Sequence, residues 1–253
     1  MVSHVDRSAD GQWCLADKKG EALSDGFDWL IVTSTALAHP RWRSTFGGEP
    51  PLVCAAASLG DASLDEALTA LAPLTSKPVT ACLLAYDGEA AAEWAALPFY
   101  KAAVEGDDEL SRIVVQRISP SLTAVALHST HSFAHGASHV YGKTSTAARL
   151  AGAASDEQAE AELLEQLLGA ASRRLGGAVS AAHLRVPAWG PHLHRWGAAF
   201  PDAPLLSADQ AVVQSARVAF CGDYVAGDRA GTVEGAALSG MHTADALKRA
   251  LGL

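Results

Sequence analysis

The chain has 253 residues, of which 49% are hydrophobic and 19% are charged. This composition predicts a globular protein with a sizeable core, built as one large domain or as two closely associated ones. The formal net charge of −9 argues against non-specific binding to nucleic acid and against an anionic membrane surface. No apolar stretch reaches the roughly 18–20 residues that a membrane span needs, and the first residues lack the pattern of a signal or transit peptide. We therefore expect a soluble protein.

Four cysteines are spread along the chain without a Cys-x-x-Cys pair: Cys14, Cys54, Cys82 and Cys221. Each lies in an apolar or strand-like run, a setting typical of buried free thiols. The spacing predicts reduced thiols in the core, in preference to disulfides or a metal site. A reducing compartment, such as the cytoplasm or an organelle interior, fits this prediction.

The N-terminal third predicts a hairpin, a buried strand and a helix. Residues 11–21 have the hairpin pattern, with the turn at Lys18–Gly20, and Leu30–Thr33 is apolar on consecutive residues until its threonine. Such a run is typical of a strand that is covered on both faces. Residues 61–74 then have the pattern of an amphipathic helix that ends at Pro73.

The middle of the chain predicts an antiparallel sheet. Strand patterns cover Val79–Tyr86, Arg112–Ile118 and Leu122–His128, and the turn sequence ISPS separates the last two. The alanine-rich segment 90–96 indicates one or two helical turns. Residues 155–175 give the clearest helix, because their leucines recur at helical spacing and two glycines follow.

The C-terminal third alternates between the two kinds of element. We predict a strand at Ser180–Val186, an irregular tract at 187–201, a strand at Arg217–Cys221 and a helix from about Thr232. Strands and helices are interleaved along the whole chain, so the predicted fold class is α/β with α+β character.

The end of the last predicted strand is a candidate ligand site. Gly222 lets the backbone approach a ligand without a Cβ in between, and the Asp223 carboxylate suits hydrogen bonds from sugar or ribityl hydroxyls. The following helix directs unpaired N–H groups and partial positive charge to the same place, which stabilises a negatively charged flavin ring. The residues alone leave open an ordinary strand–loop–helix in which the aspartate caps the helix. For Ser239, within the helix, we expect small size to matter more than the hydroxyl.

Four segments resemble a known family. The sequences CGDYV (221–225) and GTVEGAALSG (231–240) resemble the C-terminal flavin signature of the FAD-dependent amine oxidase superfamily, most of all its renalase-like branch. The sequence LHRWGAAFPDAPLL (193–206) is similar to the His-Arg-Trp segment of that branch, and LTAVALHSTHSFA (122–134) is similar to its strand and histidine-containing turn. Residues 5–36 resemble the hairpin and strand that follow the family's nucleotide-binding unit.

The resemblance implies the C-terminal part of a two-domain FAD-dependent oxidoreductase. In this scheme residues 1–60 complete the FAD-binding domain, residues 61–195 form a substrate domain around an antiparallel sheet, and residues 196–253 return to the FAD-binding domain. The full enzyme oxidises a small molecule, an amine or a reduced nicotinamide-type substrate, by hydride transfer to the flavin and passes electrons to oxygen. The implied cofactor contacts are Val5, Gly222, Asp223, Val233, Glu234, Gly235 and Ala236. The implied substrate-pocket residues are His128, Phe133, Arg195 and Trp196, and no catalytic acid or base is implied.

Several of these residues also have a purely structural interpretation. Trp196 equally suits a buried aromatic anchor, and Arg195 suits a structural ion pair. The histidines at 128, 131, 135 and 139 are close enough in sequence to raise the alternative of a transition-metal site. No cysteine or carboxylate joins them, so a polar loop of the substrate domain is the preferred interpretation, and we predict no metal.

One departure from the family pattern is severe. No two glycines in the sequence are separated by a single residue, so the GxGxxG loop that holds the FAD pyrophosphate is not present. Two interpretations stay open: a shortened form of the enzyme, or a divergent, cofactor-free protein with a binding or structural role. We expect FAD binding to be weak or absent, and we expect a protein partner or self-association to cover the sheet face that the missing unit leaves open.

Overall fold

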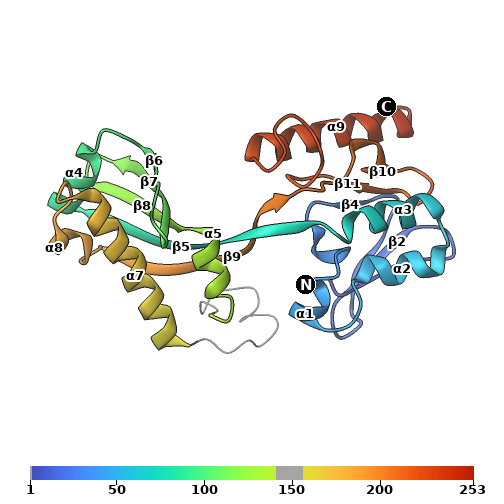
Figure 1. Ribbon diagram of the computed structural model, residues 1–253. Helices are drawn as coiled ribbons and strands as arrows, with labels where there is room; N and C mark the ends of the chain where they lie inside the picture. The colour runs from blue at the N-terminus through green and yellow to red at the C-terminus, as the bar shows by residue number, and fades with distance from the viewer. Residues whose placement is uncertain (1, 141–155) are drawn as a thin grey trace. The chain divides into compact units, whose positions relative to one another are not determined.

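The computed structural model describes residues 2–140 and 156–253, which form two compact units (Figure 1). Unit 1 comprises the described residues up to Ser76 together with Phe200–Leu253, and unit 2 comprises those within Lys77–Ala199. The chain passes between the units twice, once within strand β5 (Thr75–Asp87) and once within strand β9 (Trp189–Asp202). Unit 2 is therefore inserted into the sequence of unit 1.

Unit 1 begins with a three-stranded antiparallel sheet in the order β1-β2-β3. Its strands are β1 (His4–Arg7), β2 (Trp13–Ala16) and β3 (Ala22–Phe27). The turn predicted at Lys18–Gly20 lies between β2 and β3. Trp13 is fully buried, and its indole N–H donates to the carbonyls of Ala216 and Arg217, at 3.2 and 3.1 Å. This side chain therefore joins the N-terminal sheet to the residues directly before β11 (Val218–Phe220).

The second sheet of unit 1 joins the two ends of the chain. Its order is β10-β11-β4, with β4 (Leu30–Val32) parallel to β11 (Val218–Phe220) and β10 (Val212–Val213) antiparallel to β11. Leu30 and Val32 of β4 pack with Val218 and Phe220 of β11 in the core of unit 1. The strands predicted at Leu30–Thr33 and Arg217–Cys221 correspond to β4 and β11 and lie side by side in this sheet.

Helices cover both sides of this sheet. Figure 1 shows α2 and α3 on one side and the C-terminal helix α9 on the other. The helices of unit 1 are α1 (Trp42–Phe46), α2 (Pro51–Leu59), α3 (Ala62–Leu71) and α9 (Val233–Leu251), with short 3-10 turns at Thr35–Leu37 and Ala208–Gln210. The buried residues of α2 and α3 belong to the same core as β4 and β11, whereas α9 contributes none to it.

Unit 2 is a five-stranded sheet in the order β6-β7-β8-β5-β9. The strands not yet given are β6 (Lys101–Ala103), β7 (Leu110–Ser119) and β8 (Leu122–Ser129). The described helices are α4 (Gly88–Ala96), α5 (His131–Gly136), α7 (Glu157–Leu175) and α8 (Ala181–Leu184). Because β5, β7 and β8 pair antiparallel, the predicted sheet is confirmed, and the helix predicted at 155–175 corresponds to α7.

One face of this sheet forms the core of unit 2. Alternate residues of the central strands pack there against α4 and α7, with Trp94 stacked on Tyr86 at 5.5 Å between ring centroids. The Tyr86 hydroxyl donates to the Leu184 carbonyl, which holds α8 against the same core. We call the opposite side of the sheet the far face.

Two element predictions are wrong. Ser180–Val186 is not a strand: Ser180 caps the short helix α8, its hydroxyl accepting a hydrogen bond from the His183 N–H. The tract 187–201 is not irregular but forms most of β9, the edge strand beside β5. Its prolines suppress the strand pattern in the sequence, yet an edge strand tolerates residues that cannot donate to a neighbour.

The predicted domain boundaries also differ from the observed division. The helix α3 falls in the segment assigned to the substrate domain, but Leu64, Leu68 and Leu71 are buried in the core of unit 1. The first boundary therefore lies after residue 76 rather than after 60, and the second after 199 rather than after 195.

All four cysteines are free thiols, but they are not all in a core. Cys82 and Cys221 are buried, Cys14 is half-buried, and Cys54 is exposed on α2, contrary to the prediction. The amphipathic pattern of α2 turns Cys54 to solvent while its neighbours Leu52 and Ala55 face the core. No helix in the described part of the chain is long and apolar enough to cross a membrane.

Candidate functional site

The end of β11 requires glycine at position 222. Gly222 has a φ of +149°, and a Cβ there would lie 2.7 Å from the Tyr224 ring and 3.2 Å from the Thr33 carbonyl oxygen. Any side chain would therefore be strained and would collide with its neighbours. Glycine therefore lets the chain turn closely against Tyr224 and β4, and position 222 itself carries no side chain.

Three side-chain hydroxyls hold this strand end in place. The Tyr224 hydroxyl donates to the Val32 carbonyl at 2.6 Å, which ties the turn to β4. On α9, the Ser239 hydroxyl accepts from the Gly222 N–H at 3.2 Å and the Thr243 hydroxyl donates to the Phe220 carbonyl at 3.4 Å. Ser239 and Thr243 are the buried residues of α9. The Ser239 hydroxyl thus has a structural role beyond small size, which the sequence interpretation missed.

Asp223 is a half-buried carboxyl beside Gly222. Burial raises the pKa of its side chain, and no basic group among the described residues forms an ion pair with it. The Asp223 carbonyl accepts from the Gly231 N–H at 2.8 Å, so the loop that leads to α9 returns to the same residue. The carboxylate is available as a hydrogen-bond acceptor for hydroxyl groups.

The N-terminus of α9 is a second group of polar atoms. Thr232 is the N-cap: its hydroxyl accepts from the Gly235 N–H at 3.0 Å and donates to the Arg229 carbonyl at 2.6 Å. The Val233 and Glu234 N–H groups have no hydrogen-bond partner in the described part of the chain, and Val233 is 90% exposed. These N–H groups and the helix dipole suit a negatively charged ligand group.

Close contact with the preceding loop sets the position of this helix end. A Cβ at Gly235 would overlap the Arg229 carbonyl oxygen, so only glycine lets the loop pass so near the first turn. The Arg229 side chain pairs with Glu234 at 2.9 Å across the same turn. Ala236 continues the helix, its N–H donating to the Thr232 carbonyl.

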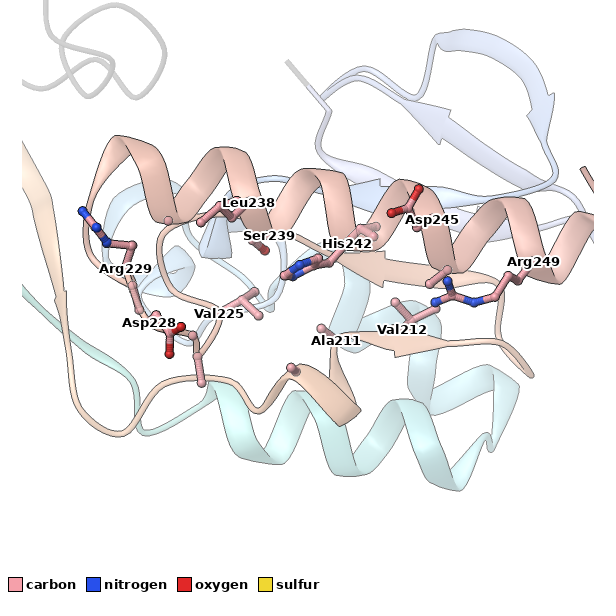
Figure 2. A pocket seen from close by; sticks show the side chains of 17 residues that line it. Ala211, Val212, Val225, Asp228, Arg229, Leu238, Ser239, His242, Asp245 and Arg249 are labelled. Atoms are coloured by element: carbon pink, nitrogen blue, oxygen red, sulfur yellow. The ribbon is translucent and has the colours of Figure 1, made fainter.

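A cavity of about 450 Å³ lies along one flank of α9 (Figure 2). It is lined by α9, the loop before it and β10, and Figure 2 shows Leu238, His242 and Arg249 of the helix facing Val225 and Val212. Of the predicted cofactor contacts it includes Gly235 alone. The cavity does not include Gly222 or Asp223, but it adjoins them through Ser239, whose hydroxyl accepts from the Gly222 N–H.

Val5, the predicted adenine contact, lies on β1 with its side chain buried in the core of unit 1. β1 is the edge strand of the β1-β2-β3 sheet, so alternate backbone groups along its outer side are unpaired. Contact of Val5 with a base would therefore run through its backbone.

In unit 2, the candidate substrate residue His128 lies on the far face of the sheet. It stands directly opposite Arg112 of β7 and Ala81 of β5. Residues opposed in this way share a face, and the flanking Leu127 and Ile113 belong to the core on the other side. Burial lowers the pKa of His128, and the charges of Arg112 and Lys101 lower it further, so the imidazole is neutral near pH 7.

Trp196 and His194 form an aromatic pair on β9, with ring centroids 4.3 Å apart in an edge-on arrangement. Leu193 is buried in the core of unit 2, so strand alternation places His194 and Trp196 on the far face. Trp196 is 53% exposed and is not a core anchor. Burial lowers the pKa of His194, with a smaller contribution from His192.

The other two predicted substrate residues lie elsewhere in unit 2. Phe133, on α5, is partly buried against the core. Arg195 alternates with Trp196 along β9 and so points to the opposite side of the strand. The structure therefore brings His128 and Trp196 to one face and separates Phe133 and Arg195 from them.

The histidine tract does not form a metal cluster in the described residues, where no group of three or more His, Cys, Asp or Glu side chains is placed to hold an ion. His128 is on β8, whereas His131 and His135 are on α5. The His131 ring nitrogen lies 3.0 Å from the Pro78 carbonyl oxygen. The strand-to-helix transition at Thr130 separates the imidazoles.

A family model described as flavin containing amine oxidoreductase matches residues 52–248. The chain belongs to this family. The match spans most of α2, the whole of unit 2, and unit 1 from β9 into α9, and thus includes the strand end at Gly222 and the helix cap at Thr232. No curated protein matches the chain.

Two solved amine oxidases resemble the fold of this family member. Cyclohexylamine oxidase from Brevibacterium oxydans IH-35A aligns over 100% of this chain and 49% of its own, at 13% identity and a TM-score of 0.56. A putrescine oxidase double mutant with a redesigned cofactor site aligns over 98% of this chain and 48% of its own, at 12% identity and a TM-score of 0.49. The chain thus spans about half the length of these oxidases.

The described residues fit one end of a flavin. At the end of β11, Asp223 offers a half-buried acceptor, and the Val233 and Glu234 N–H groups offer donors with positive polarity. Hydroxyl-bearing and electron-rich parts of a flavin need these two kinds of partner. For the pyrophosphate, no glycine-rich helix start of the GxGxxG kind is present in the sequence.

The close loop contact at the start of α9 generates a first prediction. Gly235→Ala should destabilise the protein by about 1–3 kcal/mol, because the added methyl group overlaps the Arg229 carbonyl and forces the loop to move. Gly240→Ala, in the same helix, is the control, since a Cβ there meets nothing within 4 Å. We expect it to stabilise by about 0.5–1 kcal/mol. Thermal unfolding of both variants measures the difference; equal effects would contradict the assigned contact.

The environment of His128 generates a second prediction. We expect its imidazole to titrate below the ordinary pKa of 6.5. Arg112→Gln should raise this pKa, because it removes a neighbouring positive charge, but not to the ordinary value, because burial remains. Arg117→Gln, on the same strand, removes a charge that does not act on His128, and should leave the pKa unchanged. Ring-proton NMR titration measures all three, and a wild-type pKa at or above 6.5 would contradict the placement.

Proposed function

We propose that this chain provides the flavin-facing and substrate-facing parts of an FAD-dependent, renalase-like amine oxidoreductase. In unit 1, Asp223 accepts hydrogen bonds from the ribityl chain, and the N–H groups of Val233 and Glu234 stabilise negative charge on the flavin ring. Gly222, Gly235 and Ala236 keep side-chain bulk away from these groups, and Val5 meets the adenine through its backbone. The observation that carries the proposal is the convergence of β11 and α9 at the Gly222–Ser239 hydrogen bond.

In unit 2, the far face of the sheet is the substrate side. His128 and Trp196 line it, and their aromatic rings suit a flat or apolar substrate group. A bound flavin would supply the redox chemistry: acceptance of a hydride from an amine or a reduced nicotinamide-type substrate, with oxygen as the final electron acceptor. The neutral His128 imidazole holds a proton on one nitrogen only, and so both donates and accepts hydrogen bonds at this face.

The alternative is a cofactor-free protein that uses the same fold for binding. The lack of a GxGxxG loop in the sequence favours this alternative, while Gly222, Asp223 and the capped start of α9 favour the flavoprotein. The family match, which spans the strand end and the start of α9, adds support to the flavoprotein. We therefore favour the flavoprotein.

A titration with FAD tests this proposal. We expect weak binding, reduced on the order of 10⁴-fold relative to a flavoprotein with the phosphate loop, since four charge-assisted hydrogen bonds of about 1.5–3 kcal/mol each are lost. Asp223→Ala should weaken the residual binding by a further factor of about 10, whereas Asp228→Ala, on the exposed loop nearby, should not change it. Flavin fluorescence measures the affinities.

Each other outcome of the FAD titration has a defined meaning. Sub-micromolar binding would show that another element of the chain replaces the phosphate loop. Binding that is insensitive to Asp223→Ala, or flavin fluorescence that the protein leaves unchanged at every FAD concentration, would contradict the assigned site and favour the cofactor-free alternative.

A second part of the proposal concerns the uncovered side of unit 1. The outer edge of β4 pairs with no strand in the described residues, and Ile31, which shares a sheet face with Ala219, is 48% exposed. On α9, Val233 and Met241 are exposed as well. We propose that a strand and helix of a nucleotide-binding βαβ unit, carried by another polypeptide segment, cover this edge, and that the chain self-associates without them.

Light scattering tests this surface. We expect the 253-residue chain to show an apparent mass above 26.2 kDa that rises with concentration. Ile31→Lys and Met241→Lys should each shift the mass toward the monomer, because a charge disfavours burial of either position. Tyr100→Lys, which changes an exposed apolar residue of unit 2, is the control and should have no effect. A monomer at every concentration would contradict self-association.

A further inference from the structure

Arg112 is a half-buried cation that has no partner among residues 2–140 and 156–253. Its side chain lies on the far face of the unit 2 sheet, and within the described part of the chain no carboxylate pairs with it and no acceptor hydrogen-bonds its guanidinium group. Three exposed arginines of this unit differ: Arg173, Arg174 and Arg185 pair with Glu109, Asp107 and Glu165. A partly desolvated guanidinium group that lacks acceptors favours an anion from solution.

A β-bulge gives Arg112 its orientation. On β7, Leu110 stands opposite Ser129 and Arg112 opposite His128, so Ser111 is one extra residue between the two pairs. Leu110 and Ile113 are both buried in the core although they are three positions apart. Without the bulge Arg112 would follow Leu110 by two positions and point into the core with it.

The bulge is held by its own hydrogen bonds. The Ser111 hydroxyl lies 2.7 Å from the Ser129 carbonyl oxygen and 3.2 Å from that of His128, and donates to them. Ser111 thus binds the backbone of His128, which stands opposite Arg112 on β8, and of the next residue, Ser129. A bulge pinned in this way aims a side chain at a defined point of the sheet.

Two further basic groups lie around Arg112. His128 is its direct neighbour across the strands, and Lys101 of β6 stands opposite Val114, one diagonal step from Arg112 on the same face. Lys101 is exposed and forms no ion pair with any described residue. The neighbouring residues on this face are uncharged: Ala103 opposite Arg112, and Val114 between Lys101 and Ala126. Positive charge therefore gathers on this part of the far face.

We propose that Arg112, Lys101 and His128 form an oxyanion subsite that binds the phosphate or carboxylate group of the enzyme's small-molecule substrate. Arg112 supplies a planar pair of N–H donors that fits either oxyanion, Lys101 supplies a mobile charge, and His128 supplies one N–H donor. The same cluster repels a substrate whose only charge is an ammonium group. The identity of the bound anion as a substrate group rests on the proposed function, but binding itself does not.

The subsite is tested by adding inorganic phosphate and, separately, acetate to the flavin-free full chain. Calorimetry measures affinity, and the ring-proton NMR signals of His128, identified by their loss in His128→Asn, report the location. We expect the His128 signals to move with saturation. Arg112→Gln should weaken binding about tenfold, and Arg112→Lys should weaken it less because the charge remains. Arg117→Gln on the same strand is the matched control and should bind like the wild type.

The results distinguish a phosphate-bearing from a carboxylate-bearing substrate, and they test the subsite independently of the proposed FAD site. Tighter binding of phosphate indicates a phosphate-bearing substrate, and tighter binding of acetate a carboxylate-bearing one; both support the subsite. An unmoved His128 signal, or equal affinities for Arg112→Gln and Arg117→Gln in folded proteins, overturns it. Arg112→Lys keeps the test decisive if Arg112→Gln does not fold. The FAD titration reports on Asp223 in unit 1, so failure of the subsite leaves that result unchanged.

Discussion

The parallel pairing of β4 with β11 is the contact on which the rest of unit 1 depends. It joins segments separated by most of the chain: the Tyr224 hydroxyl that reinforces it reaches the Val32 carbonyl across 192 positions. Closing so long a loop costs conformational entropy, but the cost grows only slowly with loop length. The inserted residues also fold around a separate core, so unit 2 does not depend on this closure for its own burial. Every feature at Gly222 and Asp223 follows from where β11 ends against β4.

Two helices of equal length show how differently a helix can be held in this protein. The helix α7 buries Leu164, Leu167 and Leu168 in the core of unit 2, as an amphipathic helix ordinarily does. The helix α9 instead buries Ser239 and Thr243, whose hydroxyls bind the backbone of β11. Small hydroxyl residues let the helix approach the strand end closely. Val233, Leu238 and Met241 of α9 are exposed.

The two faces of the unit 2 sheet carry different kinds of side chain: one is apolar and packed against helices, and the other carries basic and aromatic residues. Leucines, isoleucine, valines and the Tyr86–Trp94 stack occupy the face under α4 and α7. The far face carries His128, His194 and Trp196, and the bulge at Ser111 adds Arg112 to them. Partial burial and neighbouring cations keep His128 neutral, so this face combines fixed positive charge with neutral imidazole. The core of unit 2 is formed on one face of the sheet, so the opposite face can carry polar and charged side chains without loss of core packing.

Local sequence patterns were enough to predict the elements that are stabilised by residues close to one another in the sequence. The helix α7 has leucines at helical spacing, the strands β7 and β8 are separated by a short turn, and Thr232 caps α9 through its own first turn. The strand–loop–helix order at the end of β11 was predictable because a glycine and an acidic residue follow an apolar run before a capped helix. These features depend on contacts within a few residues, which sequence spacing records directly.

The tertiary structure alone decided the remaining features. The strand β9 exists because β5 offers an edge that accepts a proline-containing partner, and α3 belongs to unit 1 because its leucines meet that core. The orientation of Arg112 depends on one extra residue in β7, which the period of two in a strand cannot reveal. The hydroxyl of Ser239 gains its role from a strand end seventeen positions earlier. In each case the deciding partner is distant in sequence, so the local pattern carries no signal for it.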